Sequence, residues 1–212
     1  MDKPKIILIG GGGHCKSCID VIEQENKFEI EGIIDLPSKL GQNILGYKVI
    51  ANDDDITKFA EENKNFLITI GHLGETSLRD KIFNLIKNNG GNLPVIISPF
   101  AIVSKHSDIS EGTIIMHQAI VNSGAIIKEN CIINSKALIE HDAIIEDNTH
   151  ISTSTIINGD CKVGKNCLVG SASVIKHSVS ISNDVVIGAG AVVTTDIIES
   201  GVYVGCPAKK IK

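Results

Sequence analysis

The sequence has no tryptophan, and aromatic residues make up only 3% of its 212 positions. A core without large rings has to be filled by isoleucine, valine, alanine and leucine, which suits a fold of many small, equal layers. A basic excess is also missing, since 20 Lys and Arg stand against 25 Asp and Glu, a formal net charge of -5. Nucleic acids and acidic membranes select basic surfaces, so we expect neither as a partner.

Long hydrophobic runs are absent near the start of the sequence. The first apolar run has about five residues, which is too short for a signal peptide or a membrane-spanning helix. We therefore expect a cytoplasmic protein whose six cysteines stay reduced. Cys15 and Cys18 form a Cys-x-x-Cys pair, but no second Cys or His pair lies nearby to complete a zinc site, and we expect no metal.

A six-residue repeat runs without a gap from Ala101 to Asp196. The first position of each repeat is Ala, Ser, Thr or Cys, except at Val179 and Val185. A helix repeats its apolar face every 3.6 residues and a strand every two, so this period indicates a short strand followed by a turn, over and over. The third position is always Ile or Val: Val103, Ile109, Ile115, Val121, Ile127, Ile133, Ile139, Ile145, Ile151, Ile157, Val163, Val169, Ile175, Ile181, Ile187 and Val193.

Three such repeats close one coil of a triangular prism, so that residue i lies beside residue i+18 at a strand separation of about 4.8 Å. The β-branched position is predicted to fill the interior, and the small first position to let the corner turn without crowding. The pattern resembles the hexapeptide-repeat left-handed parallel β-helix, over residues 101 to about 196. The tail IIESGVYVGCPAKKIK resembles the closing strand and G-x-PAK sequence of that family.

Residues 1–97 carry a different pattern, in which strands alternate with helices. This alternation predicts a small parallel, Rossmann-like α/β domain, followed by the β-helix domain over residues 98–212. Pro94 and Pro99 mark the passage between them. The predicted elements are a strand Lys5–Ile9, a helix from His14 to about Gln24, strands Glu29–Ile34 and Phe66–Ile70, a helix through Ile82, Leu85 and Ile86, and a short strand near Val95–Ile97.

Four glycines, at positions 10–13, follow the first predicted strand. Glycines let a backbone approach phosphate, and the N-terminus of the following helix favours anions. Asp35 closes the second predicted strand, where its carboxylate can accept hydrogen bonds from a ribose or a base. Together they suggest a nucleotide or nucleotide-sugar pocket. Two alternatives stay open. One is a dinucleotide site, although Cys15 replaces the third glycine of its motif, and the other is a tight turn that binds nothing.

A small glycine-rich α/β domain followed by this β-helix resembles a bacterial family of sugar acetyltransferases, over the whole chain. Members N-acetylate nucleotide-linked 4-amino-4,6-dideoxy sugars, or O-acetylate sialic acid, for cell-surface glycans. The resemblance implies acetyl-CoA as co-substrate and a homotrimer. In N-acetylating members the first domain holds the nucleotide, and Gly12, Gly13, His14, Asp35 and Gly71 are the contacts expected from the resemblance.

The segment from Asn134 resembles the active-site segment of this family, in which a His is followed by an acid and, nine residues after the first His, by a second His. His141, Asp142 and His150 match these positions, and Asn134 is expected to contact the substrate. Relatives often carry Glu in place of Asp142, and Glu140 is an alternative partner for the imidazole.

The chemistry explains these residue types. Imidazole titrates near neutral pH, so His141 can accept the amine proton while the amine attacks the thioester carbonyl. A carboxylate beside the imidazole orients it and stabilises its protonated form. By the resemblance, His150, or a backbone N–H such as that of Gly159, contacts the acetyl group. His177, two predicted coils further along the same edge, is a further candidate for contact with the cofactor.

Cysteine chemistry is the alternative to direct transfer. Cys131, Cys161 and Cys167 occupy the small first position of their repeats, which indicates packing, so we expect direct transfer within a ternary complex rather than an acyl-cysteine. By the resemblance, CoA lies in a groove between two neighbouring β-helices and contacts Ser171 and Ala189, which requires an oligomer.

Three other functions are alternatives to N-acetylation of a nucleotide-linked amino sugar. The segment from His150 to Asp160 also resembles the sialic acid O-acetyltransferases. A metal enzyme of the carbonic anhydrase type requires a His-x4-His arrangement, which this sequence lacks. A non-catalytic binding or scaffold protein would not need the set of His141, Asp142 and His150.

Overall fold

The computed structural model describes residues 3–62 and 64–212. The chain forms two compact units, of which the first comprises Met1–Gly71 and Ser77–Ile96 and the second comprises His72–Thr76 and Ile97–Lys212. The five residues of His72–Thr76 thus belong with the β-helix, which the sequence pattern did not indicate. Among the described residues, no helix has both the length and the apolar character that a membrane span requires.

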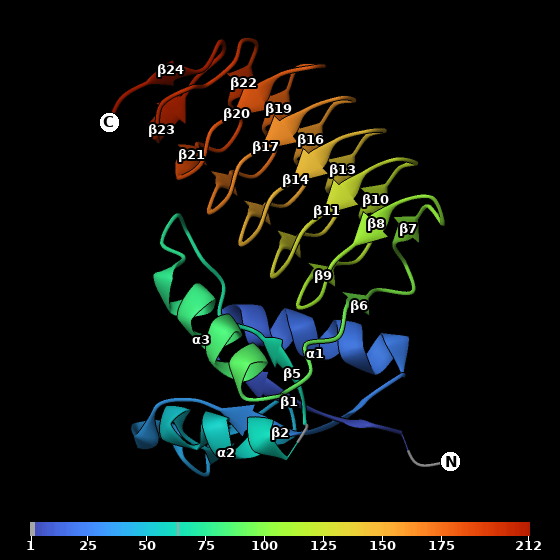
Figure 1. The fold of residues 1–212 in the computed structure, drawn as a ribbon, viewed down its shortest axis with the longest axis vertical. Helices are drawn as coiled ribbons and strands as arrows, with labels where there is room; N and C mark the ends of the chain where they lie inside the picture. Colours follow the sequence, from blue (N-terminus) through green and yellow to red (C-terminus); the bar gives the residue numbers. More distant parts are fainter. Residues whose placement is uncertain (1–2, 63) are drawn as a thin grey trace. The chain divides into compact units, whose positions relative to one another are not determined.

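The first unit is the predicted α/β domain, and its sheet has the strand order β3-β4-β2-β1-β5 (Figure 1). Strands β1 (Lys5–Ile9) and β2 (Glu29–Ile34) have the predicted bounds, whereas β5 (Asn65–Ile68) ends two residues before the predicted one. β1 pairs in parallel with β2 and β5, and β2 pairs in parallel with β4 (Tyr47–Ala51). β3 (Asn43–Ile44) adds an antiparallel edge.

Three α-helices accompany this sheet: α1 (Gly13–Glu25), α2 (Ile56–Glu61) and α3 (Ser77–Asn88). α1 and α3 were predicted, and the buried side chains of α1 include Cys18, Ile19 and Ile22, as their helical spacing implied. The sequence pattern did not predict α2, β3, β4 and the 3-10 turns Pro37–Lys39 and Asp53–Asp55. These segments mix polar and apolar residues, as in Tyr47–Ala51, and have no continuous apolar run like that of β1.

The second unit is the predicted left-handed parallel β-helix (Figure 1). The closing strand β23 (Gly201–Val204) pairs in parallel with β21 and is followed by the antiparallel β24 (Lys209–Lys210). The short strand β6 (Ile96–Ile97) lies where one was predicted. The coils are built from β7 (Ile102–Val103), β8 (Asp108–Ile109), β9 (Ile114–Ile115), β10 (Ile120–Val121), β11 (Ile126–Ile127), β12 (Ile132–Ile133), β13 (Leu138–Ile139), β14 (Ile144–Ile145), β15 (His150–Ile151), β16 (Ile156–Ile157), β17 (Lys162–Val163), β18 (Leu168–Val169), β19 (Val174–Ile175), β20 (Ser180–Ile181), β21 (Val185–Ile187) and β22 (Val192–Val193).

Every strand of the coils pairs with the strand that lies 18 residues away, as Ile120 does with Leu138 and Ile144 with Lys162. The predicted register is therefore confirmed. The strands form three sheets, which we call the β7–β22 sheet (β7, β10, β13, β16, β19, β22), the β8–β20 sheet (β8, β11, β14, β17, β20) and the β9–β21 sheet (β9, β12, β15, β18, β21, extended by β6 at one end and by β23 and β24 at the other).

The corners turn by a different device from the one expected. The sixth position of nearly every repeat has a positive φ, such as 60° at Asp142 and 77° at Gly124. Glycine, asparagine and aspartate tolerate this left-handed conformation best. The small first position instead points inward, where Ala137 and Ala143 are fully buried beside Ile139. Its size is therefore limited by the interior and not by the corner.

The fifth and sixth positions form the three edges of the prism. Because the register is 18 residues, each edge is a column of residues 18 apart. The His141 edge, between the β7–β22 and β8–β20 sheets, has at its fifth positions Lys105, Ser123, His141, Gly159 and His177. The Ser171 edge, between the β9–β21 and β7–β22 sheets, has His117, Ser135, Thr153, Ser171 and Ala189.

Candidate functional site

The predicted pair of His141 and Asp142 forms on the His141 edge. The Nδ1 atom of His141 lies 2.9 Å from Oδ2 of Asp142, and the two side chains are 57% and 67% exposed. A carboxylate only accepts hydrogen bonds, so Nδ1 carries the proton, and Nε2 of the neutral imidazole keeps its lone pair. The shorter Asp side chain therefore reaches the imidazole, and Nε2 can take a proton.

Two glycines provide the room for this pair. A Cβ on Gly159, one coil beyond His141, would lie 2.6 Å from Cε1 and Nε2 of that imidazole. A Cβ on Gly124, one coil before Asp142, would lie 2.4 Å from Oδ1 of that carboxylate. Real Cβ atoms do not approach other atoms so closely, so any larger residue at either position would displace one member of the pair.

The alternative acid, Glu140, does not bond to the imidazole. Its Oε2 accepts a hydrogen bond of 2.8 Å from the Asn122 side chain, one coil below. Asp142 is the main cause that raises the pKa of His141 above its ordinary value, through the hydrogen bond and then through its charge, and the charge of Glu140 adds to this. A raised pKa makes His141 a stronger base once it is neutral.

His150 lies in β15, on the β9–β21 sheet, and only 7% of its surface is exposed. Its Nδ1 is 3.1 Å from the carbonyl oxygen of His72, and its Nε2 is 3.1 Å from Nδ2 of Asn134. A carbonyl only accepts, so Nδ1 carries the proton and Nε2 accepts from the amide of Asn134. The rings of His72 and His150 also meet edge to face, with centroids 5.4 Å apart.

The structure separates His150 from His141 within one chain. His141 stands on the edge between the β7–β22 and β8–β20 sheets, whereas His150 lies on the third sheet, which does not border that edge. The sequence held a signal for this, because nine residues are half of the 18-residue coil. The proposed contacts of Asn134 and His150 with substrate and acetyl group stay predictions.

Ser171 and Ala189 lie on the Ser171 edge, one coil apart, and both are exposed. The hydroxyl of Ser171 is 3.2 Å from that of Ser152. Gly159 belongs to the His141 edge, so one chain places the expected cofactor contacts on two edges. The backbone N–H of Gly159 makes no hydrogen bond within residues 3–62 and 64–212.

The first unit brings together the residues that were predicted to hold a nucleotide. Gly12 is the N-cap residue of α1, and a Cβ built on Gly12 or Gly13 would point into open space. Gly71 lies beside His14, since its Cβ would be 3.5 Å from that of His14. The first turn of a helix has N–H groups without intrahelical partners, so an anion has open access to donors there.

Asp35 is already engaged by the chain itself. Oδ2 accepts hydrogen bonds of 2.8 Å from Gly11 N–H and 2.8 Å from Lys39 Nζ, and Oδ1 accepts one of 2.7 Å from Leu36 N–H. Burial raises the pKa of Asp35, but the hydrogen bonds from Lys39, Leu36 and Gly11 outweigh it and hold the pKa below its ordinary value. Asp35, in its ionised form, therefore holds in place the turn formed by Gly10, Gly11, Gly12 and Gly13, which we call the glycine turn.

Two residues beside this turn, Lys39 and Thr69, were not predicted. Lys39 places an ammonium group next to the glycines, and Thr69 Oγ1 donates to the carbonyl oxygens of Ile9 at 2.9 Å and Gly10 at 2.6 Å. Lys39 follows Asp35 by four residues, a spacing that could have suggested an ion pair. Nothing local connects Thr69 with the turn, since about sixty residues separate them in the chain.

The cysteines behave as packing residues. All six are free, and Cys131, Cys161 and Cys167 are buried in the core of the β-helix. Burial raises the pKa of Cys167 to about 11 and also raises that of Cys161, so both are protonated at neutral pH. In the part of the chain that the structure describes, no three His, Cys, Asp or Glu side chains are grouped as a metal site requires.

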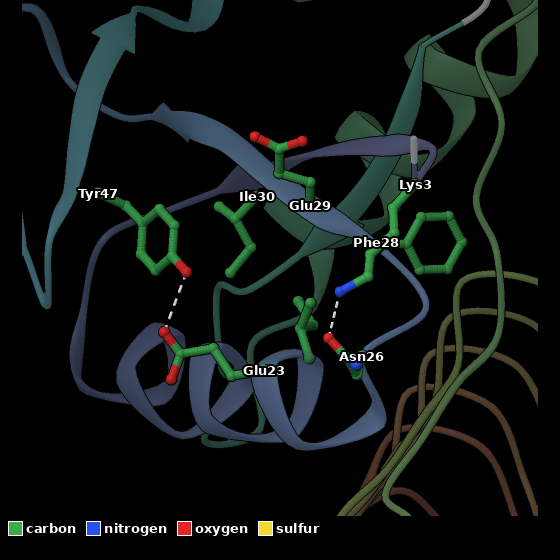
Figure 2. Close-up of a pocket in the computed structure, with 8 residues that line it drawn as sticks. Lys3, Glu23, Asn26, Phe28, Glu29, Ile30 and Tyr47 are labelled. Atoms are coloured by element: carbon green, nitrogen blue, oxygen red, sulfur yellow. Dashed lines mark hydrogen bonds between the residues drawn. The ribbon is translucent and has the colours of Figure 1, made fainter. Parts of the chain in front are cut away.

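A hollow of about 450 Å³ opens in the first unit, between the end of α1 and β2. Figure 2 shows it lined by Phe28, Ile30 and Tyr47, whose hydroxyl donates to Glu23 at 3.0 Å. None of the predicted site residues lines it. This hollow is thus distinct from the predicted nucleotide site at Gly12 and Gly13.

Comparisons with known proteins agree with this arrangement. Residues 5–86 match the family described as the PglD N-terminal domain, and residues 161–195 match the hexapeptide repeat of succinyl-transferase. A curated relative, the uncharacterized protein L142 of Acanthamoeba polyphaga mimivirus, is 35% identical over 112 residues. That match covers 52% of this chain and only 21% of the relative, so the chain spans about a fifth of the length of the relative.

Two solved structures are similar over nearly the whole chain. One is the acetyltransferase domain of PglB from Neisseria gonorrhoeae, with 26% identity, a TM-score of 0.92, and coverage of 99% of this chain and 100% of that one. The other is PerB from Caulobacter crescentus, in complex with CoA and GDP-perosamine, with 27% identity, a TM-score of 0.90, and coverage of 98% and 97%. The resemblance found in the sequence is confirmed.

Proposed function

We propose that this chain acetylates the amino group of a nucleotide-linked 4-amino-4,6-dideoxy sugar. Its matches to family models and its structural likeness are to the hexapeptide-repeat sugar acetyltransferases. The acetyl donor is acetyl-CoA. Two likenesses support this choice, since PerB was solved with CoA and GDP-perosamine and the PglB domain was also solved with acetyl coenzyme A. The single observation that carries the proposal is the pair of His141 and Asp142 between two glycines.

The reaction follows from the state of His141. The amine nitrogen attacks the thioester carbonyl carbon while Nε2 of His141 accepts the amine proton, and Asp142 stabilises the resulting imidazolium. The C–S bond then breaks, and CoA leaves as a thiolate that takes up a proton. Transfer is direct, because the cysteines of the core are buried inside the prism and burial raises the pKa of Cys161 and Cys167.

The acceptor is held by residues 1–97 in this proposal. Its diphosphate meets the open backbone of Gly12, Gly13 and His14, and the ammonium of Lys39 stands close by. Asp35 keeps the glycine turn in place and has acceptor capacity left for a ribose or base. Since acetyl-CoA and nucleotide sugars occur in the cytoplasm, where thiols stay reduced, we place the enzyme there.

We further propose a homotrimer in which the β7–β22 sheet faces the threefold axis. The outward side chains of this sheet are apolar along its whole length, whereas those of the β8–β20 sheet include Asp108, Lys162 and Ser180. A long apolar stripe on a sheet face marks a protein contact. The outward residues of the β7–β22 sheet are Ile102, Ile120, Leu138, Ile156, Val174 and Val192.

This arrangement also completes the site. The β7–β22 sheet is bounded by the His141 edge on one side and the Ser171 edge on the other. Around a threefold axis, the His141 edge of each subunit therefore meets the Ser171 edge of the next. The groove between them brings His141 and Gly159 of one subunit to Ser171 and Ala189 of its neighbour, which a single chain keeps apart.

The test follows thiol release from acetyl-CoA with a panel of acceptors. The panel holds UDP-, GDP- and dTDP-linked 4-amino-4,6-dideoxy sugars, together with free and CMP-linked sialic acid. Release with one amino sugar, reduced about 10²–10⁴-fold in His141→Ala, is expected. His106→Ala is the matched control, since His106 is an exposed histidine two coils before Asp142 in the same column.

The other outcomes identify the alternatives. Release with sialic acid alone would replace the proposal by O-acetylation. No release with any acceptor, in a protein that binds no acetyl-CoA by calorimetry, would indicate a binding or scaffold protein instead.

A further inference from the structure

Two histidines converge on the His141 edge. His141 and His177 belong to coils two steps apart, which at strand spacing separates their backbones by about 10 Å. Their ring centroids are nevertheless only 6.3 Å apart, with planes inclined by 49°. The two side chains therefore lean toward each other, and both are exposed.

The position between them is Gly159. It has no side chain to hold the two rings apart, and the imidazole of His141 lies against its Cα. The rings do not hydrogen bond to each other, because centroids at 6.3 Å leave the nearest ring nitrogens too far apart. A single small group between the rings can contact both, and the N–H of Gly159, which lies one coil from each histidine, has no hydrogen-bond partner in the described part of the chain.

We propose that His177 is a second catalytic residue, which donates a hydrogen bond to the acetyl carbonyl oxygen opposite the base His141. The inference rests on the proposed acetyl transfer and goes beyond it. As the amine attacks, the carbonyl π electrons move onto the oxygen, and His177 N–H and Gly159 N–H stabilise this charge. The oxygen then returns its electrons to carbon, the C–S bond breaks, and His141 keeps the amine proton.

His177 suits this role better than His150 does. Within one chain His150 lies on the sheet that does not border the His141 edge, and both of its ring nitrogens are already hydrogen bonded, to His72 and Asn134. The exposed imidazole of His177 makes no such bonds among the described residues. The proposed base His141 and the two proposed donors, His177 and the N–H of Gly159, thus lie on one edge of one subunit.

The experiment compares His177→Phe, which keeps a ring but no donor, with His177→Gln, which keeps a donor. In steady-state kinetics with the accepted amino sugar, His177→Phe should lower kcat about 10²-fold, the usual cost of one oxyanion donor. The KM values and the Kd for acetyl-CoA by calorimetry should stay near those of the wild type, because the bond strengthens only in the transition state. His177→Gln should recover part of kcat, and the acid limb of its pH profile should not move.

Controls separate the inference from the proposed function. His106→Phe changes another exposed histidine on this edge and should leave kcat unaltered. Equal losses in His177→Phe and His177→Gln, a loss confined to the Kd for acetyl-CoA, or no loss at all would each overturn the assignment of His177. A wild-type protein that acetylates no acceptor would overturn the proposed function itself, and the inference with it.

Discussion

The imidazole of His141 lies over Gly159, so closely that a Cβ at position 159 would be 2.6 Å from its Nε2. The two residues occupy the same column of the prism, one coil apart. The imidazole of His141 therefore has a hydrogen-bond partner at Nδ1, the carboxylate of Asp142, and room at Nε2, where Gly159 has no side chain.

Gly159→Ala should remove most of the activity with little loss of stability. The backbone φ at Gly159 is not positive, so alanine is tolerated there, and the added methyl group displaces the imidazole instead. Because a misplaced base is worth little, we expect kcat to fall about 10²-fold. Thiol release and thermal unfolding measure the two effects, and a normal kcat together with a lowered Tm would contradict the expectation.

Asp142→Asn should shift the acid limb of the pH–rate profile to lower pH. Asp142 raises the pKa of His141, so its removal lowers that pKa, and the neutral, active imidazole then persists at lower pH. The plateau rate should also fall, because the imidazolium formed during transfer loses its partner. Asparagine tolerates the positive φ of this position, which keeps the turn intact.

Asp160→Asn is the control for this shift. Asp160 occupies the same kind of position one coil further, and its Oδ2 accepts from Ser178 at 2.9 Å rather than from His141. Its charge contributes least among the causes that raise the pKa of His141, so its profile should move much less. Equal shifts in both variants would show that the hydrogen bond of Asp142 is not the dominant effect.

Ile156→Arg should break the proposed trimer. Ile156 is a partly buried, outward residue of the β7–β22 sheet, and a charge there opposes the contact of three apolar faces. Ile126→Arg is matched in repeat position and burial but lies on the β8–β20 sheet, so it should leave the assembly unchanged. Sedimentation velocity distinguishes one subunit from three, and a wild-type monomer would exclude the arrangement.

Asp35→Ala should weaken both the first unit and its binding of nucleotide sugar. The N–H groups of Gly11 and Leu36 lose their acceptor, which costs about 1–3 kcal/mol of unfolding free energy. Since hydrogen bonds hold the pKa of Asp35 low, its contribution is complete at neutral pH and is lost as the pH falls below about 3.9. The difference in unfolding free energy between wild type and variant, measured by denaturant titration, should therefore shrink from neutral to acidic pH. A difference that stays constant would refute this cause.

The β-helix could be predicted because its geometry is periodic. Each coil repeats the same short strand and turn, so the partner of Ile120 or Ile144 lies at a fixed distance in the sequence. The match of His141 and Asp142 to a known segment could be found for the same reason. The N-terminal unit was predicted only where apolar residues mark a strand or recur at helical spacing, as in β1, β2 and α1.

The prism, its register and the His–Asp pair on one edge are encoded locally, because each of them depends on residues at short or fixed separations in the chain. Three hydrogen bonds are visible only in the folded structure: from the N–H of Gly11 to Asp35, from Thr69 to the carbonyl oxygen of Gly10, and between His150 and the carbonyl oxygen of His72. These contacts join segments with no common period. They form where the chain packs, and such packing depends on the shape of the whole unit rather than on any local pattern.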